Sequence, residues 1–493
     1  MRIASLSRSI LLAGPAIMLA ACVQGPDYAR PDVPTPTSFR SPIALDEASS
    51  IADAPWWEVF KDPVLHGLVN QALTANPDVA VAAARVDQAR ALVGVAKSEA
   101  LPQINYEGGY SIERTFIPFP NAATEAEYRG ARGGISAAWE LDVWGRVKRS
   151  TEAARADLFA QEEVRRGVLL SLVTDVAAGY FELLTLDQQL RIAQESSKVY
   201  GENVDFFTRR FEAGRDTRLP VERSEANYAQ SQDRVADLGR RIAVQENVLS
   251  ILMGSYPTTI PRGRLLTDQI VPPVPVGATT ALLQRRPDIR QAEQMMISAN
   301  AQVGVAAANY FPRIGLSAFF GSQSINFESA VNQTFSIWNI GGSLVGPLFD
   351  GGRLDSEKAN REAYWDEMVG NYRKTILTAF KDTSDVLYAQ KASAERRAAL
   401  ENQVAALQRA VDLSMQRFKG GRADYYEVLE AEQQLYPAQY SLAEARRDQL
   451  AAVVSLYKAL GGGWQLTPDQ WTNGSPTVPT SETTGSTPQP KRK

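Results

Sequence analysis

The sequence has almost none of the side chains on which most metal sites and nucleophilic enzymes depend. Its 493 residues include one cysteine, Cys22, and one histidine, His66. A Cys/His zinc site needs about four ligands, and a Ser-His-Asp relay needs a histidine beside its serine. Positive charge is not in excess either, because 52 Lys and Arg face 56 Asp and Glu. The composition therefore argues against a zinc site, a histidine-dependent enzyme and a nucleic-acid-binding protein, which would show a strongly basic face.

The single cysteine closes an apolar segment at the N-terminus. Ile10–Ala21 is an apolar run of twelve residues, too short to span a bilayer as a helix. It ends in LAAC (19–22), which resembles a bacterial lipobox, where cleavage precedes the cysteine and the thiol receives a lipid. We therefore expect a signal peptide over 1–21 and lipidation at Cys22. Val23 follows instead of the aspartate typical of inner-membrane retention, which favours the outer membrane.

The chain contains the same structural unit twice. The segment VGVAKSEALPQI (93–104) returns as VGVAAANYFPRI (303–314), with six of twelve positions identical at an offset of 210. Farther along, RFEAGR (210–215) returns as RFKGGR (417–422) at an offset of 207. A loop inside each half therefore differs in length while the flanking segments keep their order. Such self-similarity indicates duplication of a whole unit.

Each unit contains two stretches in which apolar and polar residues alternate, as in half-buried strands. In the first half the strands are expected at about 103–114 and 128–142, with a long turn between them. In the second half they are expected at about 313–322 and 334–346. Their clustered aromatic residues suit a membrane barrel, which places aromatics at its two interfaces, and equally a soluble sheet. The strands alone leave both interpretations open.

Long stretches without proline follow the strands, over 146–214 and 353–419. A helix of about 67 residues, rising about 1.5 Å per residue, would be roughly 100 Å long. No compact domain needs that length. Both stretches end at glycine, Gly214 and Gly420-Gly421, a common helix stop, so we expect a shorter antiparallel helix to return from each.

Four strands per chain set a lower bound on the oligomeric state if the strands cross a membrane. Membrane barrels begin at about eight strands. Open strand edges cannot face lipid, because no water is there to bind the free N–H and C=O groups. Several chains must then share one barrel.

The segments that resemble a known family are GPDY (25–28), WWEVFKDPVLHGLVNQALTANPD (56–78), the paired VGVA segments, FDGGR (349–353) and the two RF..GR turns. Together they resemble the outer membrane factors of Gram-negative bacteria, the TolC/OprM-like efflux proteins, and among these the lipoprotein branch called the NodT family. The resemblance implies a mixed α and β fold with two structural repeats per chain. It implies a homotrimer whose outer-membrane β-barrel takes four strands from each chain, about twelve in all, and continues as a long α-helical periplasmic barrel.

The same resemblance suggests how the chain divides. We expect a signal peptide (1–21), a lipidated Pro-rich segment (22–55), a first repeat (56–254), a Pro-rich linker (255–277), a second repeat (278–466) and a disordered tail (467–493). Within each repeat a helix becomes a strand at a proline, which disfavours helix continuation and is tolerated at a strand's first residue. The expected helix-to-strand junctions are Pro102 and Pro312 on entry and Gly145 and Gly352 on return.

The function implied is the exit channel of a tripartite efflux pump that exports drugs or other small toxic solutes. Its partners would be a periplasmic adaptor (membrane fusion protein), an inner-membrane transporter of the resistance–nodulation–division type, and outer membrane lipid. No cofactor, nucleic acid or catalysis is implied. The alternatives are a type I secretion exit duct and a non-conducting, periplasm-spanning structural lipoprotein, with an enzyme least favoured.

The turns between long and short helices are expected to dock the adaptor. The residues carried over from the family are Arg210, Gly214, Arg215, Arg417, Gly421 and Arg422. An acidic ring at the periplasmic aperture falls on Glu427 and Glu430, with Arg417 and Arg422 as candidate ionic partners. The first turn departs from the pattern, because Pro220 and Arg223 stand at the equivalent places. The competing interpretation of the two glutamates is an ordinary solvated helix face.

Overall fold

The computed structural model describes residues 23–36, 38–41, 50–119, 122–272, 275, 281–324, 335–467 and 470–473. They form a mixed α and β chain with two compact units. Unit 1 takes residues up to Thr35 together with Val81–Arg165 and Pro287–Thr378, and unit 2 takes Pro36–Ala80, Arg166–Arg286 and the chain from Ala379. Two helices of 67 residues, α5 (Arg146–Glu212) and α9 (Arg353–Lys419), contribute residues to both units. The signal peptide and Cys22 lie outside the described residues.

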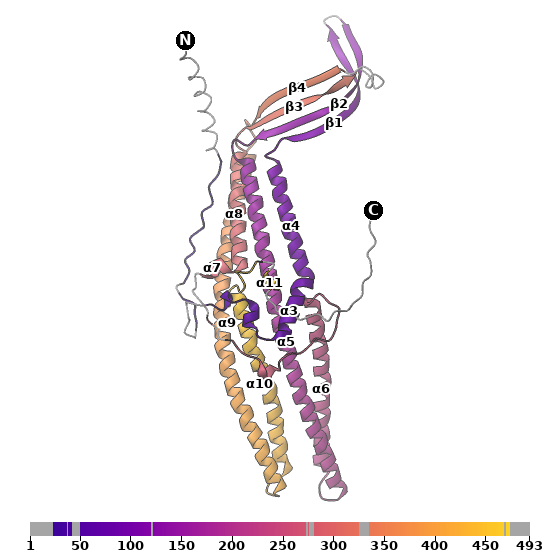
Figure 1. The fold of residues 1–493 in the computed structure, drawn as a ribbon, viewed down its shortest axis with the longest axis vertical. Coiled ribbons are helices and arrows are strands. Elements are labelled where there is room, and N and C mark those ends of the chain that lie inside the picture. The colour runs from indigo at the N-terminus through magenta and orange to yellow at the C-terminus, as the bar shows by residue number, and fades with distance from the viewer. Residues whose placement is uncertain are drawn as a thin grey trace. The chain divides into compact units, whose positions relative to one another are not determined.

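Unit 1 contains the same helix–hairpin–helix order twice (Figure 1). α4 (Pro77–Ser98) leads into strands β1 (Gln103–Phe119) and β2 (Ala122–Leu141), and α5 follows. α8 (Pro287–Ala308) leads into β3 (Arg313–Ser324) and β4 (Phe335–Val345), and α9 follows. The four strands form one antiparallel sheet in the order β1-β2-β3-β4, so β1 and β4 are its edges.

The first hairpin is longer than the sequence pattern predicted. The expected long turn between residues 114 and 128 is wrong, because backbone pairing continues up to the pair Phe119 and Ala122. Loss of the apolar alternation does not end a ladder that depends on backbone groups. Pro118 does not end it either, because β1 is an edge strand, where proline is tolerated. β3 and β4 lie within about two residues of the expected ranges.

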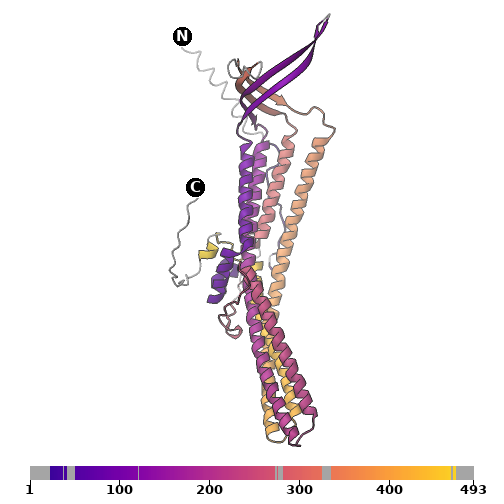
Figure 2. The same ribbon diagram turned by 90° about the vertical axis from the view of Figure 1, so that its right-hand side faces the viewer.

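Unit 2 is helical. It contains α3 (Pro63–Ala75), α6 (Leu219–Leu252), α10 (Tyr425–Ala459) and the remainders of α5 and α9, and it also includes η2 (Ile51–Asp53), α2 (Trp56–Val59), η3 (Leu266–Asp268) and α7 (Leu282–Arg285). Both views place α5 beside α6 and α9 beside α10 (Figures 1 and 2). Among the described residues, α5 is the one helix long and apolar enough to cross a bilayer, and most of that apolar stretch is buried inside the protein. Packing therefore accounts for its composition.

One hydrophobic core in unit 2 joins both repeats. Trp56, Tyr180, Leu249 and Tyr457 are fully or almost fully buried in it. Asp62 starts α3 by accepting hydrogen bonds from the backbone N–H groups of two residues of the first turn. The histidine also belongs to this region, since its ring packs edge-on against Trp56 with centroids 5.4 Å apart.

The C-terminal tail is not wholly without structure. We expected disorder from residue 467, but Gln470–Asn473 forms a helical turn, α11, and the Trp471 side chain is 2% exposed against the core of unit 2. The stabilisation from burying the Trp471 indole ring is enough to order this turn although the residues around it are polar. Residues 468–469 and 474–493 of the expected tail lie outside the described residues.

Candidate functional site

One face of the sheet carries apolar side chains that remain exposed across all four strands. Tyr106 pairs with Ile135, Ile135 with Phe320, and Phe320 with Trp338. The exposed fractions of these four side chains are 93%, 56%, 66% and 70%. The strand alternation places further exposed residues on the same face: Ile104, Ile112, Trp139, Leu316, Ile340 and Leu344. So large an exposed apolar face suits contact with lipid and not with water.

The opposite face of the sheet is mostly polar or small, with Phe319 on β3 and the exposed Phe335 and Val345 at the two ends of β4 among its apolar exceptions. Arg132 forms an ion pair with Glu107, with Nη2 and Oε1 3.4 Å apart. The same guanidinium lies 4.1 Å from the centre of the Phe319 ring. That ring lies against Gly134, where a Cβ would approach its Cζ to 2.6 Å. The sheet therefore has one face suited to lipid and one suited to water, and its two edge strands each leave one side unpaired within the described chain.

The structure places both junction prolines directly before a strand, Pro102 before β1 and Pro312 before β3. Both return glycines stand directly before a long helix with positive φ, 77° at Gly145 and 84° at Gly352. Only glycine adopts this conformation without strain. The four residues thus mark the ends of the hairpins.

Aspartates cap the long helices at these returns. The Asp142 carboxylate accepts the backbone N–H groups of Val147 and Lys148 at 3.0 and 2.8 Å. At the second return, Asp350 accepts the N–H groups of Leu354 and Gly352, both at 3.0 Å. These hydrogen bonds lower the pKa of Asp350, that of Leu354 most strongly.

Trp144 connects the two junctions and escaped the sequence analysis. Its indole Nε1–H donates to the carbonyl of Pro312 at 2.8 Å. Its ring stacks on Phe311, with centroids 4.7 Å apart and planes 22° apart. The return of the first hairpin is therefore attached to the entry of the second. A tryptophan directly before the return glycine was the available signal.

Residues 23–35, which we call the strap, pack against the helices of unit 1. Arg149, whose side chain is 5% exposed, holds the strap through Asp27 at 2.8 Å and is itself paired with Glu152 at 2.8 Å. Gly25, at φ +86°, approaches α8 so closely that a Cβ would lie 2.5 Å from the Cα of Gly304.

The strap begins beside the helix-to-strand boundary. The backbone N–H of Gln24 donates to the carbonyl of Trp144 at 3.1 Å, and a Cβ at Gly145 would lie 2.8 Å from the Val23 side chain. The residue that follows Cys22 in sequence is therefore fixed next to the end of the sheet.

The two helical turns have matching geometry. After α5, Gly214 has φ +66° and the N–H of Arg215 donates to the carbonyl of Arg210 at 2.9 Å. After α9, Gly421 has φ +67° and the N–H of Arg422 donates to the carbonyl of Arg417 at 2.9 Å. Both are glycine C-caps in which backbone groups close the helix.

Side chains of the two turns meet across a cavity of about 550 Å³. The Arg223 guanidinium lies 5.6 Å from the centre of the Tyr426 ring, within the range of a cation–π contact. Pro220, the other departure from the family pattern, stands in the first turn of α6, where a missing N–H costs no helical hydrogen bond.

The structure brings together only one of the two expected aperture pairs. Arg417 Nη1 lies 3.4 Å from Glu427 Oε2, with both side chains about half exposed. Glu430 is exposed, and neither it nor the Arg422 side chain has a hydrogen-bonding or ionic partner among the described residues. An exposed pair of this kind contributes about 0.2–1 kcal/mol.

A third glutamate near these turns is buried, and the sequence analysis missed it. Glu432 is 3% exposed, and no hydrogen-bond partner reaches its Oε2 among the described residues. Burial raises its pKa to about 7, and the Asn203 side chain acts in the opposite direction. The spacing Tyr425, Val428, Leu429, Glu432 follows one helical stripe, which was the signal that could have placed this carboxyl inside.

The comparisons with known proteins agree with this geometry. The family model of outer membrane efflux proteins matches residues 68–255 and 279–462. SrpC of Pseudomonas putida, a solvent efflux pump outer membrane protein, is 33% identical over 461 residues, covering 91% of this chain and 97% of SrpC. SilC of Salmonella typhimurium, a probable outer membrane lipoprotein, is 31% identical over 465 residues, covering 91% of this chain and 97% of SilC. The solved outer-membrane channel OprN is similar at a TM-score of 0.82 with 28% identity, covering 90% of this chain and 100% of OprN.

Each matched stretch contains one helix–hairpin–helix repeat, and the similarity to a solved channel covers nearly the whole described chain. A sheet with one lipid-type face and one water-type face is what a channel wall requires. The chain therefore belongs to the outer membrane efflux protein family and is an outer-membrane exit channel that extends into the periplasm.

Proposed function

We propose that three copies of this chain form the exit channel of a tripartite pump that expels small toxic solutes from the cell. The observation that carries the proposal is the four-stranded sheet with an exposed apolar face and two unpaired edges. Unpaired backbone groups are very costly in lipid. Copies joined edge to edge, β4 of one against β1 of the next, remove every open edge.

The purified protein tests this directly. Light scattering in detergent should give the mass of three chains, and planar bilayers should show stepwise conductance with one unit size. A folded, monodisperse monomer, or a trimer without conductance, would contradict the proposal. In cells, deletion of the gene should increase sensitivity to solvents or antibiotics, and the intact gene should restore resistance.

Lipidation at Cys22 is part of the proposal. Within the strap, the backbone N–H of Gln24 donates a hydrogen bond to the carbonyl of Trp144 at the end of the sheet. A lipid on Cys22 would then enter the membrane at the level where the strands enter it. The relative SilC is itself a probable lipoprotein.

The helical turns are the proposed docking site for a periplasmic adaptor, which connects the channel to an inner-membrane transporter of the resistance–nodulation–division type. The cavity between the two turns, with Arg223 over Tyr426, offers a surface to which both repeats contribute. Energy comes from the transporter, and this subunit performs no catalysis. SrpC belongs to a solvent efflux pump, so apolar organic solutes are the substrates to test first.

Glu427 and Glu430 are proposed to narrow the periplasmic aperture. Threefold symmetry brings several carboxylates near one axis, and the link from Glu427 to Arg417 helps to hold the turn closed. Replacing both glutamates with alanine should leave the trimer intact and increase its conductance.

A matched control removes two exposed glutamates of other helices, Glu202 and Glu225, and should leave conductance unchanged. Equal conductance of the wild type and the Glu427→Ala/Glu430→Ala trimer would show that these carboxylates are only a solvated helix face.

A further inference from the structure

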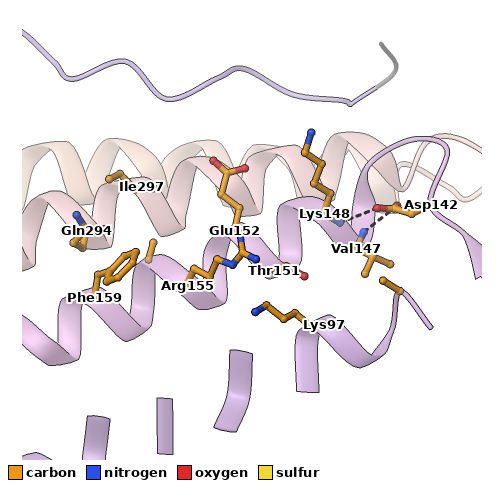
Figure 3. A pocket seen from close by; sticks show the side chains of 12 residues that line it. Lys97, Asp142, Val147, Lys148, Thr151, Glu152, Arg155, Phe159, Gln294 and Ile297 are labelled. Carbon is orange, nitrogen blue, oxygen red and sulfur yellow. Dashed lines mark hydrogen bonds between the residues drawn. The ribbon is translucent and has the colours of Figure 1, made fainter. Parts of the chain in front are cut away.

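A cavity of about 720 Å³ lies in unit 1, beside the boundary between helices and strands. The last turn of α4, the return from β2, the first turns of α5 and one side of α8 form its walls (Figure 3). Part of the lining is apolar, from Val147, Ala156, Phe159 and Ile297. The Phe159 ring is 49% exposed, so this apolar wall is open to an occupant.

The acidic side chains of the cavity already have hydrogen-bonding or ionic partners. Asp142 accepts the backbone N–H groups of Val147 and Lys148. Glu152 is paired with Arg149 at 2.8 Å, and Arg149 also holds the strap. Neither carboxylate forms an ion pair with Lys97, Lys148 or Arg155 among the described residues.

Three cations line the same cavity: Lys97 from α4, and Lys148 and Arg155 from α5. Their side chains have no hydrogen bond or ion pair within the part of the chain that the structure describes. Figure 3 shows Lys97 and Arg155 extending toward each other from the two helices. Like charges converging on one apolar-walled cavity favour an anion between them.

The cavity adjoins the apolar face of the sheet. Trp139, which belongs to that face, donates its indole N–H to the carbonyl of Ala100 at 3.0 Å, and Ala100 lines the cavity. An occupant with an anionic head in the cavity could therefore lay an apolar chain along the residues around Trp139. Basic pockets at the membrane boundary bind lipid head groups in this way.

We propose that Lys97, Lys148 and Arg155 bind the phosphate of an anionic glycerophospholipid from the periplasmic leaflet of the outer membrane, one lipid per chain. The guanidinium of Arg155 donates two parallel hydrogen bonds to phosphate oxygens, and the lysines add charge. The bound lipid closes the space between α4 and α8 below the sheet. This inference rests on the proposed channel, whose strands lie in the membrane.

Native mass spectrometry of the purified full-length trimer tests the site. The trimer is titrated with phosphatidylglycerol and, separately, with phosphatidylcholine of the same acyl chains. The wild type should prefer phosphatidylglycerol by at least about tenfold. The Lys97→Gln/Lys148→Gln/Arg155→Gln variant should lose most of that preference.

The matched control replaces three exposed cations outside the cavity, Arg85, Lys198 and Arg409, with glutamine. It removes the same formal charge and should keep the preference. Loss of preference in both variants, or in neither, overturns the site, because binding would then follow net charge or other residues.

Inorganic phosphate added as competitor separates the two sources of the anion. A lipid site should keep phosphatidylglycerol bound, since the acyl chains contribute to affinity. Complete displacement at equal concentrations would show a site for free phosphate and would overturn the lipid assignment. The triple variant should still form a conducting trimer. A wild-type protein that neither trimerises nor conducts would refute the proposed function, whereas a conducting trimer without lipid preference would refute only this site.

Discussion

Glu432 should make the stability of the helical turns depend on pH. The carboxyl is buried among Tyr200 and Asn203 of α5 and Tyr425 and Tyr436 of α10. Burial also raises the pKa of all three tyrosines, so they stay neutral at pH 8. The buried glutamate is therefore the group of this cluster that titrates near neutrality.

The direction of the pH dependence is set by which state, folded or unfolded, binds the proton of Glu432 more tightly. Burial raises the pKa of Glu432 from 4.5 to about 7 in the folded state. Between these values the folded state binds more protons than the unfolded state, so the free energy of unfolding falls as pH rises. The full loss is about 3 kcal/mol per chain, and the part between pH 6 and pH 8 is about 1.4 kcal/mol, or about tenfold in a local opening equilibrium.

Hydrogen exchange of the purified trimer measures that opening. After correction for the intrinsic exchange rate, peptides from the first turns of α10 and from the last turns of α5 should be about tenfold less protected at pH 8 than at pH 6. The Glu432→Gln variant keeps the shape and removes the charge, so its protection should be equal at both pH values. Glu430→Gln, at an exposed position two residues away, should behave as the wild type. A pH effect that survives in Glu432→Gln would refute the reasoning.

Three further predictions concern the strap and the junctions. Arg149→Met removes the strap's contact with Asp27 and should expose the strap to limited proteolysis of the folded trimer; an unchanged cleavage rate would show that other contacts hold it. Trp144→Phe keeps the ring stack but loses the hydrogen bond to Pro312, which should lower trimer stability by about 1 kcal/mol, measured as the midpoint of thermal dissociation; no shift would mean that the junctions are not coupled through this bond. Cys22→Ser should abolish metabolic labelling with a fatty acid while the trimer still forms, and labelling that persists would exclude Cys22 as the attachment site.

The sequence predicted those features that repeat or alternate. The two copies of the VGVA segment, each ending at a proline before a strand, follow from helix and strand preferences that operate within a few residues. The alternation through Tyr106 gave the composition of the sheet faces correctly. Which face meets lipid became clear only when the register aligned Tyr106, Ile135, Phe320 and Trp338 in one row.

The features that were missed depend on partners distant in sequence. Trp144 donates to a carbonyl 168 residues away, and its position before the return glycine does not reveal which carbonyl it reaches. Glu432 lies in the polar segment EAEQQL, and although the helical stripe through Val428 places it on the apolar face of α10, its burial depends on the packing of α5 against α10. Of the ionic links expected for Glu427 and Glu430, the ion pair between Arg417 and Glu427 is present, and the place of these residues at an aperture stays a prediction.

The two unpaired edges of the sheet have a consequence for genetics. Because β1 and β4 of one copy must be completed by other copies, a chain cannot supply a working channel alone. A variant with intact strands but defective helical turns would still assemble with wild-type chains, and each mixed trimer that contains it would be inactive. Such variants should be dominant when expressed beside the normal gene, whereas variants that disrupt the strand edges should be recessive, since they are never incorporated.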